Sequence, residues 1–409
     1  MEKIIKWTCF FTSGLVVAAF VFAMYISTLL PDTFLVRSGD GVRVAGMPFL
    51  FSTPSGPRDA VANLQSGASY NADLSIAGLV PIKTVRAKVV ERRVVQVCGT
   101  PFGIKMFANG AMVVGFSDIY TESGYQNPAK DAGLRMGDVI VSIAGTETKT
   151  NEDVAGAIQQ LKGAPAEVVY LREGVEKSVM LTAVKDVSAG VYRTGMWVRD
   201  SSAGIGTLTF TESTHQMFAG LGHSIHDADT GVTISLLKGE IVPVSITGVM
   251  RGEAGSPGEL KGSFLTALPS GVITVNGESG VYGTLSSYIK GEEMEAALAQ
   301  DVMTGKAEII TTLEGQEPKR YEVQIEKIAL NSDDPNRNMV IHVTDPELLA
   351  ATGGIVQGMS GSPIIQNSKF IGAVTHVLVN DPTRGYAIFG ENMLETLDAA
   401  AQNPSQLAS

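Results

Sequence analysis

The stretch from Gly353 to Val379 constrains the fold most, because a glycine-rich turn lies there between two β-rich runs. The turn reads GMSGSP and covers residues 358–363. Glycines on both sides of a serine let the backbone turn tightly and bring its N–H groups close to a ligand. A nucleophilic serine needs that arrangement, with an exposed hydroxyl and amides aimed at a developing oxyanion. A hairpin turn without chemistry fits the same six residues, so both interpretations stay open here.

Length and composition predict a mainly β protein of several domains. A chain of 409 residues is expected to form two or three domains. Glycine is abundant, and charged residues make up only 18% of the chain, which favours turn-rich β structure. Short β runs recur from Gly206 to Val343 and predict a pair of barrels or sandwiches. A net charge of −11 without a basic cluster argues against nucleic-acid binding.

The N-terminal region predicts a membrane anchor. Lys3 and Lys6 precede an uncharged, largely apolar run from Trp7 to Leu30, and a bilayer is spanned by about 20 such residues. Lysines before the run and Asp32 after it place the N-terminus inside. We therefore expect residues 1–30 to be a cytoplasmic stub and a transmembrane signal anchor, with a cleaved signal peptide as the alternative. Prolines and glycines break up the following residues, so 31–96 is expected to be an extended, protease-accessible linker.

Residues 97–186 show the pattern of a small α+β domain. The segment PAKDAGLRMGDVIVSIAGTETKTNEDVAGAI, at 128–158, resembles the core of a PDZ domain. The resemblance implies a groove between a strand and the helix 151–162 that takes a peptide by strand addition. Its carboxylate-binding loop is expected at Pro101, Phe102, Gly103 and Ile104. Those residues depart from the usual Gly-Leu-Gly-Phe form, and a module used only for intramolecular packing is the alternative.

The histidines point to a catalytic base in the last part of the chain. All five lie beyond residue 214, and a serine nucleophile needs an imidazole to accept its proton. His223 lies in a glycine-flanked loop, GLGHSIHDADTG, that can reach another element. Asp345, Asp227 and Asp229 are candidates for the acid that orients it, although Asp345 fits a helix N-cap equally well. His223, His226, Asp227 and Asp229 also permit a metal site.

Three segments carry a second resemblance. They are FAGLGHSIHDADTG, WVRDSSAGIGTLTF and TDPELLAATGGIVQGMSGSPIIQNSKFIGAVTHVLVNDPTRGYAIF. They resemble the stage IV sporulation protein B family, membrane-anchored PDZ serine peptidases of endospore-forming bacteria. The resemblance implies Ser360 as nucleophile, His223 as base and Asp345 as acid, with no cofactor or metal. Because GMSGSP is similar to the GDSGGP of chymotrypsin-like enzymes, it also implies a two-lobed β-barrel peptidase domain over 187–409. The N–H groups of Gly358 and Ser360 would then form the oxyanion hole.

The family resemblance also implies a signalling role. Such peptidases cut themselves, here expected within 31–96, in the space between the two forespore membranes. They then cut the regulatory subunit of a membrane complex that processes the late mother-cell pro-sigma factor, while the PDZ domain holds a partner or their own chain. Two other hypotheses remain: a PDZ adaptor with a decayed peptidase domain, and a metal-dependent hydrolase that uses the 223–229 cluster.

Overall fold

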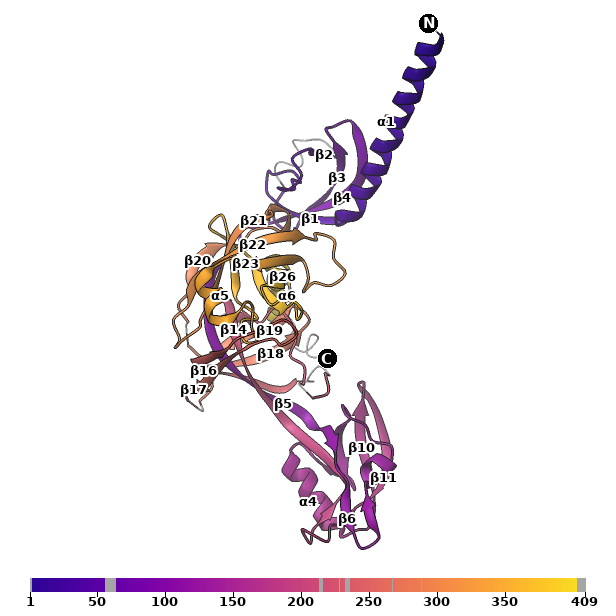
Figure 1. Ribbon diagram of the computed structural model, residues 1–409, viewed down its shortest axis with the longest axis vertical. Helices are drawn as coiled ribbons and strands as arrows, with labels where there is room; N and C mark the ends of the chain where they lie inside the picture. Colours follow the sequence, from indigo (N-terminus) through magenta and orange to yellow (C-terminus); the bar gives the residue numbers. More distant parts are fainter. Residues whose placement is uncertain are drawn as a thin grey trace.

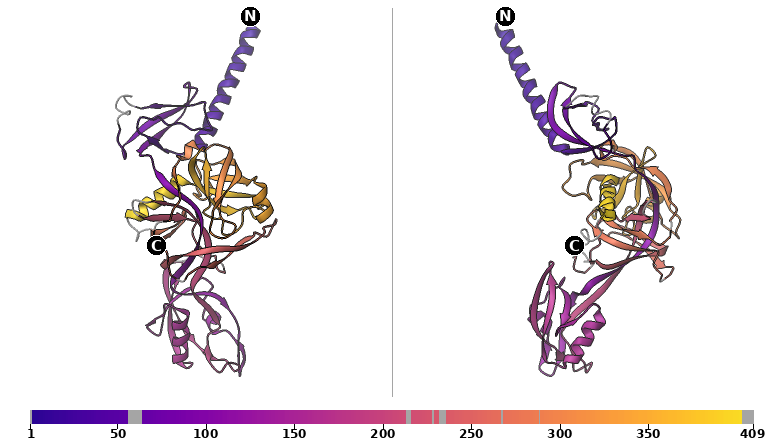
Figure 2. Two further views of the ribbon diagram at one scale, coloured as in Figure 1. Left: turned by 90° about the vertical axis from the view of Figure 1, so that its left-hand side faces the viewer. Right: turned by 180° about the vertical axis from the view of Figure 1, so that it is seen from behind.

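The chain folds into an elongated molecule in which three β-rich parts follow a long helix (Figure 1). The computed structural model describes residues 2–55, 64–212, 216–227, 229–231, 236–266, 268–287 and 289–402. Helix α1, Glu2–Leu29, projects from one end, and the PDZ-like part forms the other. Figure 2 shows the same linear order from two further sides, with the barrels in the middle.

A small sheet packs against the end of α1. Its order is β1 (Thr33–Arg37), β4 (Val80–Val90), β3 (Ser69–Ile76) and β2 (Leu50–Pro54). Leu30, Phe34, Leu74 and Ala87 are buried together between this sheet and the helix. The prediction of an extended linker over 31–96 is therefore wrong, although residues 56–63 of it lie outside the described residues. Prolines and glycines here end short strands that alternate buried and exposed side chains, as in β4.

The first lobe of the peptidase part is a closed six-stranded barrel. Its strands are, in order around the barrel, β5 (Val94–Phe116), β14 (Met196–Glu212), β15 (Met217–Gly220), β19 (Gly280–Leu285), β18 (Gly271–Gly277) and β16 (Leu236–Met250). The barrel closes because β16 also pairs with β5. β17 (Glu259–Phe264) and β20 (Glu292–Glu295) extend it at β16 and β5. Phe102, Phe218 and Ile273 lie in its core.

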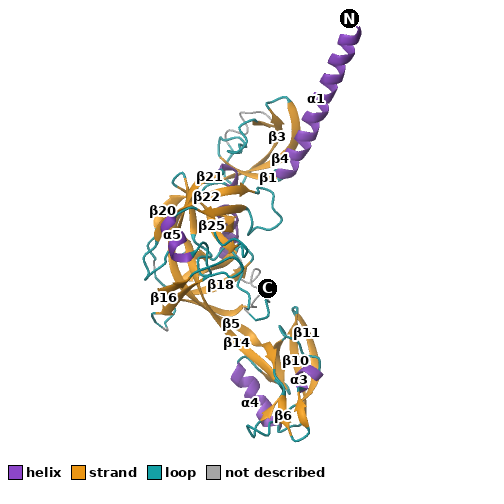
Figure 3. Ribbon diagram, in the orientation of Figure 1, coloured by secondary structure: helices purple, strands orange, loops and turns teal. Residues whose placement is uncertain are grey.

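The second lobe is also a closed six-stranded barrel. Its order is β21 (Gly305–Thr311), β22 (Lys319–Ile328), β23 (Met339–Val343), β26 (Arg384–Phe389), β25 (Lys369–Val377) and β24 (Pro363–Gln366). Helix α5 (Pro346–Thr352) follows β23, α6 (Gly390–Gln402) ends the described chain, and the short 3-10 helix η1 covers Ala299–Asp301. Figure 3 shows how strands dominate both lobes. The expected mainly β, chymotrypsin-like pair of barrels is confirmed.

The PDZ-like part is inserted into the first barrel. It comprises β6 (Ile119–Thr121), β7 (Gly124–Gln126), α3 (Pro128–Asp131), β8 (Val139–Ile143), β9 (Thr146–Glu147), α4 (Asn151–Leu161), β10 (Pro165–Arg172), β11 (Val175–Thr182), β12 (Val184–Lys185) and β13 (Tyr192–Arg193). Both β5 and β14 run from the barrel into its sheet, whose order is β11-β10-β8-β5-β14. The expected boundary at 97 therefore cuts through β5, the first strand of the barrel, and the boundary at 187 falls before β13, inside the PDZ-like part.

The membrane-span prediction concerns α1. In the part of the chain that the structure describes, no helix is long and apolar enough to cross a membrane. The expected span includes positions 8, 9, 11 and 12, whose side chains lie outside the described residues.

Candidate functional site

The turn that carries Ser360 is held to the first barrel through its carbonyl groups. The N–H of Thr207 on β14 donates to the Ser360 carbonyl at 3.0 Å, and the Thr207 hydroxyl donates to the Gly358 carbonyl at 2.8 Å. Thr209 donates its hydroxyl to the Gly361 carbonyl, also at 2.8 Å. Any side chain at Gly361 would collide with the Thr207 carbonyl oxygen, so glycine is required at this contact. Strand β14 of the first barrel thus holds the turn of Ser360 in place by hydrogen bonds.

Two amides of this turn remain available. Gly358 has φ +96°, which glycine adopts without strain. Within the described residues, the N–H groups of Gly358 and Ser360 have no acceptor, whereas that of Met359 donates to Val356. An oxyanion hole needs unengaged donors of this kind. The geometry is therefore compatible with the predicted pair, whose role stays a prediction.

Ser360 and Ser362 have different surroundings. The Ser360 hydroxyl donates to the Thr375 carbonyl at 2.7 Å. The Ser362 side chain is fully buried, and its oxygen has no hydrogen-bond partner among the described residues. The Ser362 backbone instead takes part in the hydrogen bonding of the turn, because its N–H donates to the Met359 carbonyl at 2.9 Å and its carbonyl accepts from the Val374 N–H at 2.9 Å.

The loop that carries His223 lies against this turn. It follows β15 after Leu221 and Gly222, whose positive φ angles of 68° and 74° reverse the chain. A Cβ added at Gly361 would come 2.5 Å from the Leu221 nitrogen, and one at Gly222 would come 3.0 Å from the Thr375 side chain. The loop of His223 and the turn of Ser360 therefore touch through their backbones.

The His223 ring is oriented by a carbonyl group. Its Nδ1 lies 2.7 Å from the Ser224 carbonyl oxygen. A carbonyl only accepts, so Nδ1 carries the proton and Nε2 is left as the basic nitrogen. Burial lowers the pKa of His223, opposed by this hydrogen bond, and the nearby His226 lowers it further. A neutral imidazole with a free Nε2 is the form that a general base requires.

His376 is a neighbour of the base that the sequence did not identify as part of the site. It follows Thr375 on β25, and its ring centroid is 4.7 Å from that of His223, with the planes 34° apart. Burial, followed by the charges of His223 and Arg337, lowers the pKa of His376 to about 4. His376 is therefore neutral at pH 7 and packs against the base without competing charge.

Asp345 occupies a helix N-cap. One carboxylate oxygen accepts from the N–H groups of Glu347 and Leu348, at 2.9 and 3.0 Å, and the other accepts from Glu322 N–H at 3.2 Å. Among the described residues, no contact joins Asp345 to His223. The structure thus brings the turn of Ser360 and the loop of His223 together but not Asp345, and the triad roles of all three residues stay predictions.

Asp227 and Asp229 are engaged by Arg199. Their carboxylates lie 3.1 and 2.6 Å from the Arg199 guanidinium, and Asp227 is only 2% exposed. Burial raises the pKa of Asp227, but its bonds to Thr230 and Asp229 and the Arg199 charge outweigh this and hold the pKa below its usual value. Among the described residues, no three metal-ligand side chains gather around a common point. The alternative of a metal site at 223–229 finds no support.

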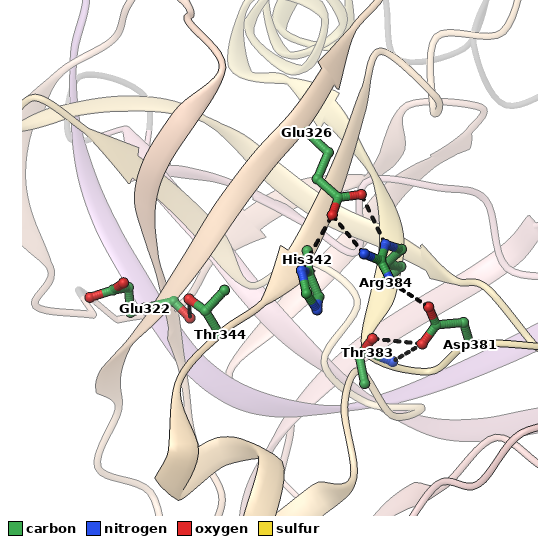
Figure 4. Close-up of polar contacts among 7 residues, drawn as sticks. All are labelled: Glu322, Glu326, His342, Thr344, Asp381, Thr383 and Arg384. Carbon is green, nitrogen blue, oxygen red and sulfur yellow. Dashed lines mark hydrogen bonds and ion pairs between the residues drawn. The ribbon is translucent and has the colours of Figure 1, made fainter.

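A separate charged network lies on the second barrel (Figure 4). Arg384 contacts both oxygens of Glu326, at 2.9 and 2.8 Å, and also contacts Asp381. His342 Nδ1 lies 3.3 Å from Glu326. His342 is thus tied to β22 and β26 rather than to the nucleophile, and the network joins three strands of the barrel.

The predicted PDZ loop at Pro101, Phe102, Gly103 and Ile104 is wrong. These residues lie inside β5, paired with β14 on one side, and from Phe102 onward with β16 on the other. Phe102 is 4% exposed and Ile104 is 5% exposed, both in the barrel core. A glycine between β-forming residues is found in loops and in strands equally well. Pairing with residues a hundred or more positions away in the sequence determines that this segment is a strand.

The place where a peptide groove is expected lies between β14 and α4. Among the described residues, 196–200 of β14 pair only with β5, which leaves their other edge unpaired. Helix α4 runs along that edge: Gln159 exchanges two hydrogen bonds with the Tyr192 backbone, and Asn151 N–H donates to Asp200 at 3.2 Å. An unpaired strand edge beside a helix accepts a peptide by strand addition. Gly195, with φ +83°, opens the turn before the strand.

The comparisons with known proteins agree with two parts of this architecture. The family described as SpoIVB peptidase S55 matches residues 190–394, and the PDZ domain family matches 125–172. The predictions of a PDZ domain and of a serine peptidase are thereby confirmed. No curated protein matches the chain.

Several solved structures match part of the chain. The PDZ domain of the SdrC-like protein from Listeria monocytogenes is 19% identical, with 22% of this chain and 87% of that chain covered and a TM-score of 0.18. The HtrA-type protease AlgW with a decapeptide is 10% identical, with coverages of 50% and 55% and a TM-score of 0.32. An inactive mutant of Rv3671c from M. tuberculosis is 12% identical, with coverages of 48% and 82% and a TM-score of 0.29.

Proposed function

The chain belongs to the SpoIVB peptidase S55 family of serine peptidases, and from this premise we propose that it cuts its own chain and then a second, membrane-bound protein. The observation that carries the proposal is the contact between the Ser360 turn, with its two available amides, and the loop of His223. A nucleophile, a base and oxyanion donors are the parts that acyl transfer to a serine needs.

In the proposed reaction, His223 Nε2 removes the Ser360 proton as the serine oxygen attacks the scissile carbonyl carbon. The N–H groups of Gly358 and Ser360 stabilise the oxyanion that forms. His223 then protonates the leaving amine, and water repeats the sequence on the acyl-enzyme. The Ser360 hydroxyl must first turn from the Thr375 carbonyl, where it now donates, toward Nε2.

Self-cleavage within 31–96 requires an accessible segment. Most described residues of this region are folded into the small sheet, so a cut inside it needs local unfolding. Glu91 and Arg92 are exposed and irregular between β4 and β5, at the junction with the first barrel. This junction is our proposed site, because cleavage there separates α1 and the sheet from the peptidase part without disturbing either core.

The signalling role follows from the family rather than from the geometry. The proposed second substrate is the regulatory subunit of the complex that processes the late mother-cell pro-sigma factor. Attachment through α1, with the peptidase outside the cytoplasm and between the forespore membranes, is part of the same proposal. Exposed apolar side chains along α1 support it, among them Leu15, Val17 and Phe20, which are 61–74% exposed. Solvent-exposed apolar surface of this extent commonly marks a contact with a partner or a membrane.

Self-cleavage of the full chain tests the peptidase proposal. The wild type is expected to release a fragment cut near Glu91, as identified by mass spectrometry, and Ser360→Ala is expected to lose activity by at least about 10³-fold. Ser362→Ala is the matched control, because the Ser362 hydroxyl has no hydrogen-bond partner in the part of the chain that the structure describes. Unchanged cleavage in Ser360→Ala would contradict the serine mechanism. If the wild type cuts nothing, the result would favour a non-catalytic PDZ adaptor. If a chelator abolishes cleavage while Ser360→Ala still cleaves, the result would favour a metal-dependent hydrolase.

A further inference from the structure

Arg199 joins the PDZ-like part to the loop that carries the base. It lies on β14 opposite Met112 of β5, inside the PDZ-like sheet. Its guanidinium contacts the Asp227 carboxylate at 3.1 Å and the Asp229 carboxylate at 2.6 Å. Asp227 lies four positions beyond His223 and is 2% exposed, so its charge depends on these partners for compensation. The ion pair is therefore a firm connection between two parts of the fold.

Asp227 organises the end of the His223 loop. Its other oxygen accepts from the N–H groups of Asp229 and Thr230, at 3.1 and 3.0 Å, and from the Thr230 hydroxyl at 3.1 Å. The middle of the loop has a separate anchor, because Asn276 of β18 accepts from Ile225 N–H at 2.8 Å and donates to its carbonyl at 3.1 Å. One anchor thus belongs to the barrel, whereas the other reaches across from the PDZ-like sheet.

The strand that carries Arg199, β14, also forms one edge of the proposed peptide groove and donates hydrogen bonds to the turn of Ser360. Residues 196–200 of β14 form the unpaired groove edge, and Asp200 is bonded to the start of α4. Further along the same strand, Thr207 and Thr209 hold the Ser360 turn. A cavity of about 390 Å³ between this strand and the base loop is lined by Arg199, Ser202, Ile225 and His226 among others. The cavity leaves room for the arginine and the loop to shift together.

We propose that Arg199 is a positioning residue for the peptidase. Through its ion pairs with Asp227 and Asp229, it fixes the position of the His223 loop. Because Arg199 lies on the strand that edges the groove, that position depends on whether a peptide is bound there. The inference rests on the proposed function. A peptide that adds to the edge of 196–200 bonds to the backbone on both sides of Arg199 and constrains the twist of the strand. Because the strand end and the base loop are joined by a hydrogen-bonded ion pair, they move as a unit.

The test compares two arginines of similar setting in the full chain. Arg199→Met removes the connection, and Arg199→Lys keeps the charge. Arg172→Met is the matched control, since Arg172 forms an ion pair at 2.7 Å with Asp138, which is 1% exposed, without touching the base loop. We expect Arg199→Met to lower kcat at least about tenfold with KM little changed, as loss of a transition-state contact does. Arg172→Met is expected to lower the melting temperature but keep kcat, and the exchange Arg199→Asp with Asp227→Arg is expected to restore part of the lost activity.

A hexapeptide with a free carboxyl-terminal valine is the groove probe, because Met196 and Val198 of the strand edge and Ala157 and Leu161 of α4 are apolar and only partly buried. It is expected to change the wild-type kcat by about 5-fold or more, a usual size for coupling between two sites. The response should persist in Arg172→Met and disappear in Arg199→Met. A full response or a wild-type kcat in Arg199→Met overturns the inference, as does a wild type that binds the peptide without responding.

Hydrogen exchange keeps the two proposals apart. Exchange in residues 221–227 is expected to rise in Arg199→Met and to change on peptide binding only when Arg199 is present. If the wild type proves inactive, the peptidase proposal fails, but this measurement still decides the role of Arg199. Unchanged exchange in Arg199→Met would overturn it.

Discussion

Ser360 donates its hydroxyl to the Thr375 carbonyl, and His223 donates Nδ1–H to the Ser224 carbonyl. Two backbone acceptors therefore hold the nucleophile and the base. Among the described residues, no hydrogen bond engages His223 Nε2 or the amides of Gly358 and Ser360. At the level of single residues, neighbouring backbone groups engage some polar atoms of the site and leave others available. His376 contributes by covering one face of the His223 ring.

The pH dependence of cleavage follows from these surroundings. Burial lowers the pKa of His223, so the free base persists below the ordinary histidine value of about 6.5. We expect the acidic limb of the kcat/KM profile to lie below pH 6.5. His376→Ala uncovers the ring and is expected to move this limb to higher pH, whereas His376→Phe keeps a neutral ring in place and should not. A limb above pH 6.5 in the wild type would contradict the assignment of His223 as the base.

Stability should follow the same residues. The unfolded chain protonates its histidines near pH 6.5, but the folded protein resists protonation of His376 until about pH 4. The contribution of His376 to the free energy of unfolding is therefore fully present above pH 6.5, and it is lost as the pH falls toward 4. The fall in melting temperature between pH 7 and 4.5, measured by calorimetry, is expected to be smaller in His376→Phe. An equal fall in both proteins would show that His376 titrates as in the unfolded chain.

At the level of elements, β14 and α5 show how one segment takes two tasks. β14 forms the groove edge, passes Arg199 and ends by holding the Ser360 turn. Helix α5 begins at Asp345, which accepts three backbone N–H groups. The same carboxylate is the predicted triad acid, so its capping role must be separated from catalysis by substitution.

Asp345 variants separate the two roles. Asp345→Ala removes the cap and is expected to lower the free energy of unfolding by about 0.5–2 kcal/mol, measured by urea denaturation. Asp345→Asn keeps a side-chain acceptor and should lose less. Equal stability of wild type and Asp345→Ala would contradict the cap. A kcat that falls by about 10⁴ in Asp345→Asn would show that Asp345 is the triad acid in the active state, because an amide in that place favours the wrong tautomer.

At the scale of the whole molecule, the sheet after α1 separates the helix from the barrels, and the PDZ-like part lies at the far end (Figure 1). Ala23, Ile26 and Leu30 of the region around the end of α1 are buried. The last turns of α1 therefore belong to a folded domain, whereas its earlier turns expose apolar side chains.

Removal of residues 2–21 tests this division. The full chain is expected to sediment with membranes, whereas the shortened chain is expected to stay in the supernatant, because it lacks most of the exposed apolar surface of α1. Its melting temperature should stay unchanged, since Ala23, Ile26 and Leu30 are retained. A full chain that stays in the supernatant would contradict the proposed anchor.

Local patterns were sufficient to predict the turn of Ser360, the loop of His223 and the helix over 151–162, which the structure has as α4, because glycines and apolar periodicity act within a few positions. Only the tertiary structure decided matters that depend on distant pairing. It placed Phe102 in a barrel strand rather than a peptide loop, and brought His376 to His223. It also made Asp227 the partner of Arg199 rather than of the base. The sequence of a strand does not indicate which other strand it pairs with. The pairing is determined by the closure of the barrels and the burial of their cores.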